Sequence, residues 1–310
     1  MNDATKTYDL VIIGAGPAGM TAAIYAQRAN LNLLLLDKLA PGGQVVNTLE
    51  VQNYPATGTI NGAELAIKMF EHTQELGVEF DYGTVNRIEL DGDDKILHCE
   101  EGQSFRCKAV IIATGTMPRR LGVPGEEDFA GGSLSWCAIC DGAQYRDKRV
   151  VVIGGGNSAV EESLYLASIA TELTVITMLD LTADPSACDK LRAMPNVKIY
   201  EWHDIIEFTG GERMEKVRAK SSKTGEEIVV ETDGAFEYIG LEPTAQAFES
   251  LGILNKFGYI ETDEWMATKV AGIFGAGDIN SKVLRQIVTA CSDGALAAQA
   301  AARHVKSLTK

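Results

Sequence analysis

The chain is poor in proline, histidine and positive charge. It contains 8 prolines and 4 histidines in 310 residues. Lysine and arginine total 28 against 43 aspartates and glutamates, so the formal net charge is −15. A surface this acidic repels phosphate backbones and anionic lipid headgroups. We therefore expect neither a nucleic acid nor a membrane as partner.

Long apolar runs are missing as well. Runs such as residues 33–36 and 150–153 are far shorter than the ~20 residues that a bilayer-spanning helix needs. Residues 1–9 include two acids and no signal-peptide core. We expect a cytoplasmic protein, in which the six cysteines serve as free thiols unless they have a redox or metal role.

The composition that remains is that of a globular protein. Hydrophobic residues make up 45% of the chain and charged residues 23%. At roughly 100–200 residues per domain, the length suggests two domains. Glycine is abundant, with 31 residues, as in proteins with many tight turns between strands and helices.

A glycine motif follows the first apolar segment. Residues 8–13 predict a buried strand, Gly14-Ala-Gly-Pro-Ala-Gly19 follows directly, and residues 20–27 predict a helix. The next expected strand, residues 31–36, ends at Asp37. This is the dinucleotide-binding fingerprint in its required context, with glycines that let the backbone approach a pyrophosphate and an acid for a ribose hydroxyl. The helix N-terminus would stabilise the phosphates.

A second copy of this pattern begins at residue 149. A short apolar strand runs into Gly154-Gly-Gly-Asn-Ser-Ala159, a helix is expected to about residue 169, and residues 173–177 predict the next strand. Two copies indicate two nucleotide-binding domains. Each is expected to be a doubly wound α/β sheet.

Two further segments extend the first domain. A buried strand from residue 107 ends in Ala113-Thr-Gly115, and another from residue 272 closes on Gly277-Asp278. An alanine-rich helix is expected over about 286–305. Its N-terminus, which carries partial positive charge, can point at a bound cofactor.

The segment Cys137-Ala-Ile-Cys140-Asp141 lies between these motifs. A disulfide across two residues exchanges easily, and an adjacent acid can move protons during thiol chemistry. Zinc would need a second pair of ligands, which the dispersed histidines and other cysteines do not offer. A catalytic dithiol is therefore favoured over a zinc site or an inert pair, and no metal is expected. The other cysteines, Cys99, Cys107, Cys188 and Cys291, are expected to be packing or surface thiols.

Taken together, these motifs resemble the low-molecular-weight thioredoxin reductases over essentially the whole chain. The resemblance also rests on Gly42-Gly-Gln44, Asn53-Tyr-Pro55 and Arg285-Gln286, and on a CxxC that lies in the second nucleotide domain. It implies an α/β fold with two Rossmann-like, three-layer nucleotide-binding domains, the second inserted into the first. It implies an FAD-binding domain from residues 1–114 and 243–310, and a pyridine-nucleotide domain from 115–242.

The resemblance also implies roles. Cys140 would receive electrons from FAD, Cys137 would attack the disulfide of thioredoxin, and Asp141 would donate a proton. A homodimer is implied. The residues expected to bind FAD are Gly14, Gly16, Pro17, Ala18, Gly19, Asp37, Lys38, Gly43, Gln44, Asn53, Val85, Ala113, Thr114, Gly115, Gly277, Asp278, Arg285, Gln286 and Ile287. Those expected to bind a pyridine nucleotide are Gly154, Gly156, Asn157, Ser158, Ala159, Thr177 and Asp180.

One departure from the family concerns the electron donor. The family has a His-Arg-Arg run and a later arginine that hold the 2′-phosphate of NADPH. Here Thr177-Met-Leu179 and Ala183 stand in those places, and Asp180 and Asp184 are nearby. Each lost charge-assisted hydrogen bond is worth roughly 1.5–3 kcal/mol. NADPH is therefore disfavoured.

Three donors stay open. NADH is favoured, because Asp180 or Thr177 could accept from its ribose hydroxyl. Ferredoxin or a reduced flavin is a second possibility, although ferredoxins are themselves acidic. A third is weak or dual use of NADH and NADPH, with Lys190 or Arg192 contacting the phosphate.

The acceptor also has alternatives to thioredoxin. One is another thiol protein, such as a glutaredoxin-like protein, and another is a regulatory flavoprotein without turnover. Finally, Glu237 occupies a place where relatives have an apolar residue. We expect a partly exposed edge position there, and the alternative is that Glu237 shapes the donor site.

Overall fold

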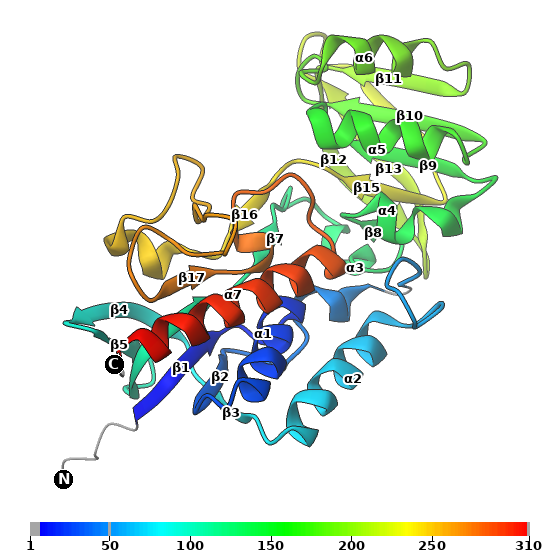
Figure 1. Cartoon of the computed structure of the whole chain (residues 1–310). Helices are drawn as coiled ribbons and strands as arrows, with labels where there is room; N and C mark the ends of the chain where they lie inside the picture. The colour runs from blue at the N-terminus through cyan, green and yellow to red at the C-terminus, as the bar shows by residue number, and fades with distance from the viewer. Residues whose placement is uncertain (1–6, 49–50, 309–310) are drawn as a thin grey trace. The chain divides into compact units, whose positions relative to one another are not determined.

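The computed structural model describes residues 7–48 and 51–308, and the chain divides into two compact units (Figure 1). The first unit is built from residues 7–47, 60–117 and 242–308. The second is built from residue 48, 51–59 and 118–241. The chain therefore leaves the first unit near residue 117 and returns to it near residue 242. No helix among the described residues is long and apolar enough to span a membrane.

The first unit is organised around a mixed sheet. Its strand order is β3-β2-β1-β6-β5-β4, and β17 also pairs with β6. The pairs that join β3, β2, β1, β6 and β17 are parallel, whereas β4, β5 and β6 form an antiparallel meander. The strands are β1 (Thr7–Ile13), β2 (Leu33–Asp37), β3 (Glu79–Tyr82), β4 (Val85–Asp91), β5 (Asp94–Cys99), β6 (Ser104–Ile112) and β17 (Ile273–Gly275).

Helices α1 (Pro17–Arg28), α2 (Gly62–Glu75) and α7 (Ile287–Leu308) belong to the same unit. Helix α7 lies along α1 (Figure 1), and its buried side is mostly alanine. The contact is so close that a Cβ on Gly294 of α7 would stand 2.1 Å from the carbonyl oxygen of Ala18. Small side chains thus bring the last helix against the first. The unit also has 3₁₀ helices at Gly43–Asn47, Gln246–Leu251 and Gly277–Ile279.

The second unit has a parallel sheet of order β11-β10-β9-β15-β8. Its strands bury a run of branched side chains, such as Val150–Ile153, because the sheet is covered on both faces. These strands are β8 (Leu134–Ser135), β9 (Arg149–Ile153), β10 (Glu172–Thr177), β11 (Val197–Glu201) and β15 (Gly234–Glu237).

One face of this sheet packs on helices and the other on a small antiparallel sheet. The helices on the first face are α4 (Ala138–Asp141), α5 (Asn157–Ala167) and α6 (Pro185–Arg192), with a 3₁₀ helix at Gly142–Tyr145. The short helix α3 (Glu126–Phe129) lies on the other face, where Phe129 packs with the small sheet. The small sheet consists of β12 (His203–Gly210), β13 (Met214–Ser221) and β14 (Glu227–Glu231). Its Phe208, Met214 and Val217 meet Val151 and Ile153 in one buried cluster. Two short strands, β7 (Thr116–Pro118) and β16 (Leu241–Pro243), pair with each other.

The expected α/β class with two Rossmann-like units is confirmed. Element boundaries differ by a few residues from those expected. The strand expected at 31–36 is β2, which ends at Asp37, and the helix expected over 286–305 is α7, which continues to Leu308. The assignment of FAD to residues 1–114 and 243–310, and of a pyridine nucleotide to 115–242, stays a prediction. Residues 1–6, 49–50 and 309–310 lie outside the described part of the chain.

Candidate functional site

The first glycine motif forms the turn between β1 and α1. Gly14 has a φ of +105°, and a Cβ there would lie 2.4 Å from the carbonyl oxygen of Ala113. A Cβ on Gly19 would lie 1.8 Å from the carbonyl oxygen of Gly14. Pro17 occupies the first turn of the helix, where its missing N–H costs no hydrogen bond. The motif therefore leaves backbone amides at the start of α1 for a phosphate.

Asp37 supports this turn from the end of β2. Its Oδ2 accepts a hydrogen bond from the backbone N–H of Ala15 at 2.6 Å, and its Oδ1 accepts one from Leu39 at 2.9 Å. Each oxygen keeps a second lone pair for a ribose hydroxyl. Lys38, the next residue, is exposed.

Gly43 faces the first glycine motif. With a φ of +60°, it would place a Cβ 3.2 Å from the Cα of Gly16. The backbone N–H of Gly42 donates to Ala15 at 2.8 Å, which fixes this segment against the turn. Gln44 is exposed beside it. Gly16 and Gly43 thus line one narrow backbone cradle.

The other expected FAD residues of this unit lie at the carboxyl ends of its strands or nearby. Ala113 N–H donates to Ile13 at 2.7 Å, and the Thr114 hydroxyl donates to the carbonyl of Thr244 at 2.6 Å. Gly115 follows with a φ of +67°. Val85 begins β4 and is buried.

Asp278 carries a buried oxygen that the protein itself does not use. Its Oδ1 has no hydrogen-bond partner among the residues that the structure describes. Burial raises the pKa of this carboxyl group. Gly277, just before it, has a φ of +82° and would put a Cβ 2.8 Å from the Cβ of Ala18 on α1. An orphaned acceptor beside the first glycine turn fits a ligand that brings hydroxyl groups, such as the ribityl chain of FAD.

Arg285 makes several contacts within the protein, and its part in FAD binding stays a prediction. Its guanidinium donates to the carbonyl oxygens of Asp278, Asn280 and Lys282 and lies 4.5 Å from the ring centroid of Tyr259. These bonds shape the loop after β17, so Arg285 holds the segment that presents Asp278. Gln286 and Ile287 lead into α7.

Asn53 belongs to a different compact unit from the other expected FAD residues. It belongs to residues 51–59, which cluster with the second unit. Its part in FAD binding stays a prediction.

The second glycine motif repeats the geometry of the first. Gly154 has a φ of +130°, and a Cβ there would lie 2.4 Å from the carbonyl oxygen of Tyr238. Gly156 precedes α5, whose first residues are Asn157, Ser158 and the buried Ala159. The Asn157 side chain accepts from the backbone N–H of Asp184 at 3.0 Å. This side chain thereby anchors the loop that follows β10.

The end of β10 is acidic. Arg192 donates to Asp180 at 3.0 Å and also to Glu201, so two carboxylates share this one cation. Met178 and Leu179 are exposed, and Thr177 is buried against Gly155. The hypothesis that Arg192 contacts a 2′-phosphate loses support here, because its charge is already compensated by two acids.

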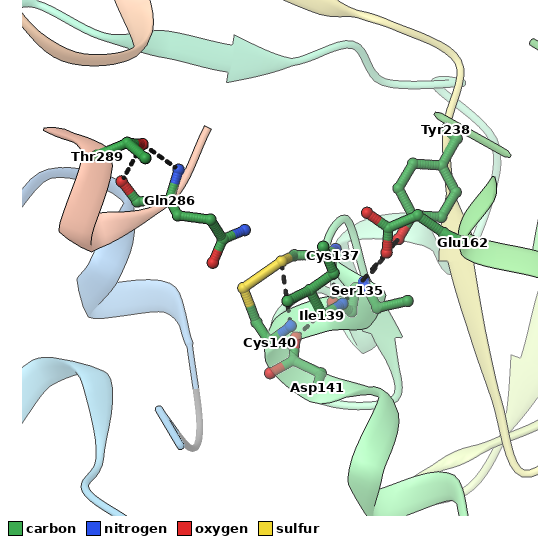
Figure 2. Close-up of a disulfide and its surroundings, with 10 residues drawn as sticks. Ser135, Cys137, Ile139, Cys140, Asp141, Glu162, Tyr238, Gln286 and Thr289 are labelled. Atoms are coloured by element: carbon green, nitrogen blue, oxygen red, sulfur yellow. Dashed lines mark hydrogen bonds between the residues drawn. A yellow bond between two sulfur atoms is a disulfide. The ribbon is translucent and has the colours of Figure 1, made fainter. Parts of the chain in front are cut away.

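The two CxxC cysteines form a disulfide, with Cα atoms 5.3 Å apart (Figure 2). Cys137 caps the N-terminus of the single turn α4 and Cys140 lies within it, where Cys140 N–H also donates to Cys137 Sγ at 3.2 Å. Ser135 donates from its hydroxyl to Asp141 and accepts from Cys137 N–H at 3.2 Å. A disulfide is the expected oxidised form of a redox dithiol. Among the described residues, no group of three or more histidine, cysteine or acidic side chains could hold a metal.

The remaining four cysteines are thiols and not disulfides. Cys99, Cys107 and Cys188 are buried and Cys291 is partly buried. Burial raises the pKa of Cys99 to about 11 and that of Cys107 to about 12. These two thiols therefore stay protonated and unreactive at neutral pH.

The expectation for Glu237 was wrong. This residue is 2% exposed and lies in β15, between β9 and β8, not at an edge. Its Oε2 accepts from Trp136 Nε1 at 3.0 Å, and Glu126 lies close by. Burial, and then the negative charge of Glu126, raise the pKa of Glu237 to about 8. A protonated Glu237 can donate to Glu126, and a neutral acid costs less to bury than a carboxylate.

Two residues near the disulfide had no role in the sequence analysis. Tyr238, just after β15, accepts from the N–H of Ala138 at 2.6 Å and donates to Glu162 of α5 at 3.0 Å (Figure 2). The sequence places Glu162 in the helix of the second glycine unit, but its partner Tyr238 is 76 residues away. No local pattern pairs them.

Comparison with known proteins agrees with this geometry. The family described as "Pyridine nucleotide-disulphide oxidoreductase" matches residues 8–294. A thioredoxin reductase of Bacillus subtilis is 45% identical over 306 residues, 98% of this chain and 96% of the relative. A 34.2 kDa protein in the rubredoxin operon of Clostridium pasteurianum is 45% identical, with 97% and 98% covered.

A solved structure shows the same fold over nearly the whole chain. The thioredoxin reductase from Streptococcus pyogenes superposes with a TM-score of 0.92 at 42% identity, and covers 98% of this chain and 100% of its own. The family match of this chain, its two glycine turns and its CxxC disulfide lead to one assignment. The chain belongs to the pyridine nucleotide-disulphide oxidoreductases and, among them, to the low-molecular-weight thioredoxin reductase family.

Proposed function

We propose that this protein is an FAD-dependent thioredoxin-disulfide reductase. The observation that carries the proposal is the Cys137–Cys140 disulfide, in a unit whose sheet also presents the second glycine turn. The proteins of B. subtilis and S. pyogenes that it resembles are named thioredoxin reductases. These names supply the substrate class, since the disulfide alone does not.

The residues of the first unit fit FAD. Side chains at Gly14 and Gly43 would crowd the backbone of this cradle, and Asp278 offers an unused acceptor among the described residues. Asp37 stands at the end of the second strand, the usual place for a ribose contact. When bound, FAD would supply the two-electron chemistry that links a donor to the disulfide.

The chain's own part is thiol–disulfide exchange. In the reduced protein, the Cys137 thiolate attacks one sulfur of the thioredoxin disulfide, that S–S bond breaks, and a mixed disulfide forms. Cys140 then attacks the Cys137 sulfur, which releases thioredoxin as a dithiol and restores the Cys137–Cys140 bond. Asp141, held by Ser135, is placed to give a proton to a departing thiolate.

For the donor, we favour NADH over NADPH. Arg192 is engaged by Asp180 and Glu201, and the neighbouring Met178 and Leu179 offer no charge to a 2′-phosphate. The exposed Asp180 carboxylate can instead accept from a ribose hydroxyl. We also propose a homodimer, as the resemblance implies.

The experiment that tests this function is anaerobic reduction of the flavin, followed by its visible absorbance. NADH, NADPH and reduced ferredoxin are added separately, and oxidised thioredoxin follows in each mixture. We expect rapid bleaching by NADH and recovery of colour once thioredoxin is added. Bleaching of the flavin by ferredoxin alone would assign the donor role to ferredoxin. Recovery of the flavin colour without reduction of thioredoxin would reject thioredoxin as the acceptor.

A further inference from the structure

The backbone amides of the turn between the redox cysteines donate to two kinds of acceptor, a cysteine sulfur and side-chain oxygens. Cys140 N–H points to Cys137 Sγ at 3.2 Å. Ala138 N–H donates to Tyr238 Oη at 2.6 Å, and Ile139 N–H donates to Glu162 Oε2 at 3.1 Å (Figure 2). Only the first of these amides is directed at sulfur. The other two donate to side chains of Tyr238, just after β15, and of Glu162 in α5.

Tyr238 and Glu162 also bind each other. Tyr238 Oη donates to Glu162 Oε2 at 3.0 Å, so that one carboxylate oxygen accepts from both the phenol and Ile139. The pKa of Glu162 is raised overall, because burial outweighs these donors, which act to lower it. Burial also raises the pKa of Tyr238, which therefore stays a neutral donor. An oxygen that accepts two hydrogen bonds suits the ionised form of Glu162.

This arrangement has an electrostatic consequence for the reduced protein. Hydrogen bonds donated to a thiolate favour it, and a nearby like charge disfavours it. Tyr238 and Glu162 hold two amides of this turn, and Glu162 adds a negative charge to it. Asp141 is the other acid at this turn, and Ser135 holds it. The exposed Glu161 is adjacent to Glu162 on α5.

We propose that Tyr238 and Glu162 are positioning residues that fix the turn between Cys137 and Cys140 and, through the charge of Glu162, make this disulfide harder to reduce. The proposal rests on the proposed function only in that the pair is redox-active. It does not require that thioredoxin be the acceptor or NADH the donor.

The test is the equilibrium of the pair with dithiothreitol in the FAD-loaded protein. Reduction breaks the Cys137–Cys140 bond, and the two thiols of dithiothreitol lose two electrons and form its cyclic disulfide. The protein thiols take up the protons that dithiothreitol releases. Samples at set ratios of reduced to oxidised dithiothreitol are quenched in acid and alkylated, and mass spectrometry gives the reduced fraction.

Glu162→Gln removes the charge but keeps an amide oxygen that can accept from Ile139. We expect the equilibrium constant to move about tenfold toward the dithiol, which corresponds to ~30 mV for a two-electron couple. Tyr238→Phe frees Ala138 N–H for sulfur and leaves Glu162 with one donor fewer, so it should move the constant in the same direction. The double variant should shift less than the sum of the two, because the side chains act as one unit.

Glu161→Gln is the matched control, since it removes the same charge from the adjacent exposed position. A constant for Glu162→Gln within twofold of the unmodified protein would overturn the proposal, and so would an equal shift in Glu161→Gln. Strict additivity of the double variant would overturn the coupling. If Tyr238→Phe does not fold, the two glutamine variants still decide the charge effect. If the protein does not reduce thioredoxin, the equilibrium of the cysteine pair with dithiothreitol can still be measured. The proposed function and this inference can therefore fail separately.

Discussion

The hydroxyl of Ser135 donates a hydrogen bond to the carboxylate of Asp141, across the turn that carries the disulfide. The same hydroxyl oxygen accepts from the backbone N–H of Cys137 at 3.2 Å. Ser135 thereby links the proposed proton donor to the first cysteine. Since Ser135 ends β8 and Asp141 ends α4, the strand fixes where the acid lies relative to the dithiol.

We therefore predict graded effects at these two positions. Asp141→Asn should lower thioredoxin turnover about 100-fold, because a positioned proton donor typically contributes 10²–10⁴-fold. Ser135→Ala should cost only several-fold, because the acid stays but loses its orienting partner. Steady-state turnover across pH 6–9 measures both. Equal losses in the two variants would contradict the assignment of Asp141 as the donor.

Replacement of Cys140 by serine should separate flavin binding from disulfide chemistry. The FAD cradle lies in the first unit and Cys140 in the second, so the variant should keep its yellow colour. It should lose thioredoxin reduction, since the resolving thiol is gone. The measurements are the visible spectrum and turnover. Retained turnover would reject the dithiol mechanism, whereas a colourless protein would point to a folding defect.

Glu237 predicts a specific pH dependence of stability. Its pKa is raised to about 8 by burial, against an ordinary value near 4.5. Between these pH values the folded chain holds a proton that the unfolded chain has released, so this residue makes stability fall as pH rises. The loss is complete above about pH 8.

Glu237→Gln mimics the protonated acid, since its amide can accept from Trp136 and donate to Glu126. We expect it to flatten the fall in unfolding temperature between pH 5 and 8, and to stabilise the protein at pH 8 by roughly 1–3 kcal/mol. The exposed Glu226→Gln serves as control. A slope unchanged from the unmodified protein would mean that Glu237 is already ionised in the folded state.

The donor proposal predicts a gain of function. Arginines at Met178 and Leu179 would place two cations at the end of β10, where we propose that a pyridine nucleotide binds. Each new charge-assisted hydrogen bond is worth roughly 1.5–3 kcal/mol, so flavin reduction by low NADPH concentrations should accelerate at least tenfold. Stopped-flow absorbance measures this rate. Val229→Arg, at another exposed apolar position of the second unit, should have no effect. Efficient use of NADPH by the unmodified protein would contradict the proposal.

Gly294 tests the contact between the first and last helices. A Cβ there would lie 2.1 Å from the carbonyl oxygen of Ala18, so Gly294→Ala must push α7 away from α1. We expect a loss of stability of roughly 1–3 kcal/mol and weaker FAD binding, because α1 carries the glycine motif. Thermal unfolding and flavin release measure these. Gly211→Ala, where a Cβ would meet no atom within 4 Å, should leave both unchanged.

The sequence by itself determined the repeated strand–glycine–helix units, the CxxC and the uncharged residues at 177–179 and 183. These features are local: a glycine turn needs consecutive residues, and a positive φ at Gly14 or Gly154 follows from the tight turn that the motif encodes. Local pattern was therefore sufficient for the class of fold and for the redox pair.

Only the tertiary structure decided which partners the acidic side chains have, because those partners come from segments distant in the sequence. Glu237 lies in an interior strand of the sheet because β8 adds beyond β15, an order that no local pattern sets. Arg192 is neutralised by Glu201, a residue brought to it by the pairing of β10 with β11. Tyr238 and Glu162 meet at the disulfide although 76 residues separate them. The energy of a buried charge depends on neighbours from several elements, and so it is fixed only when the chain has folded.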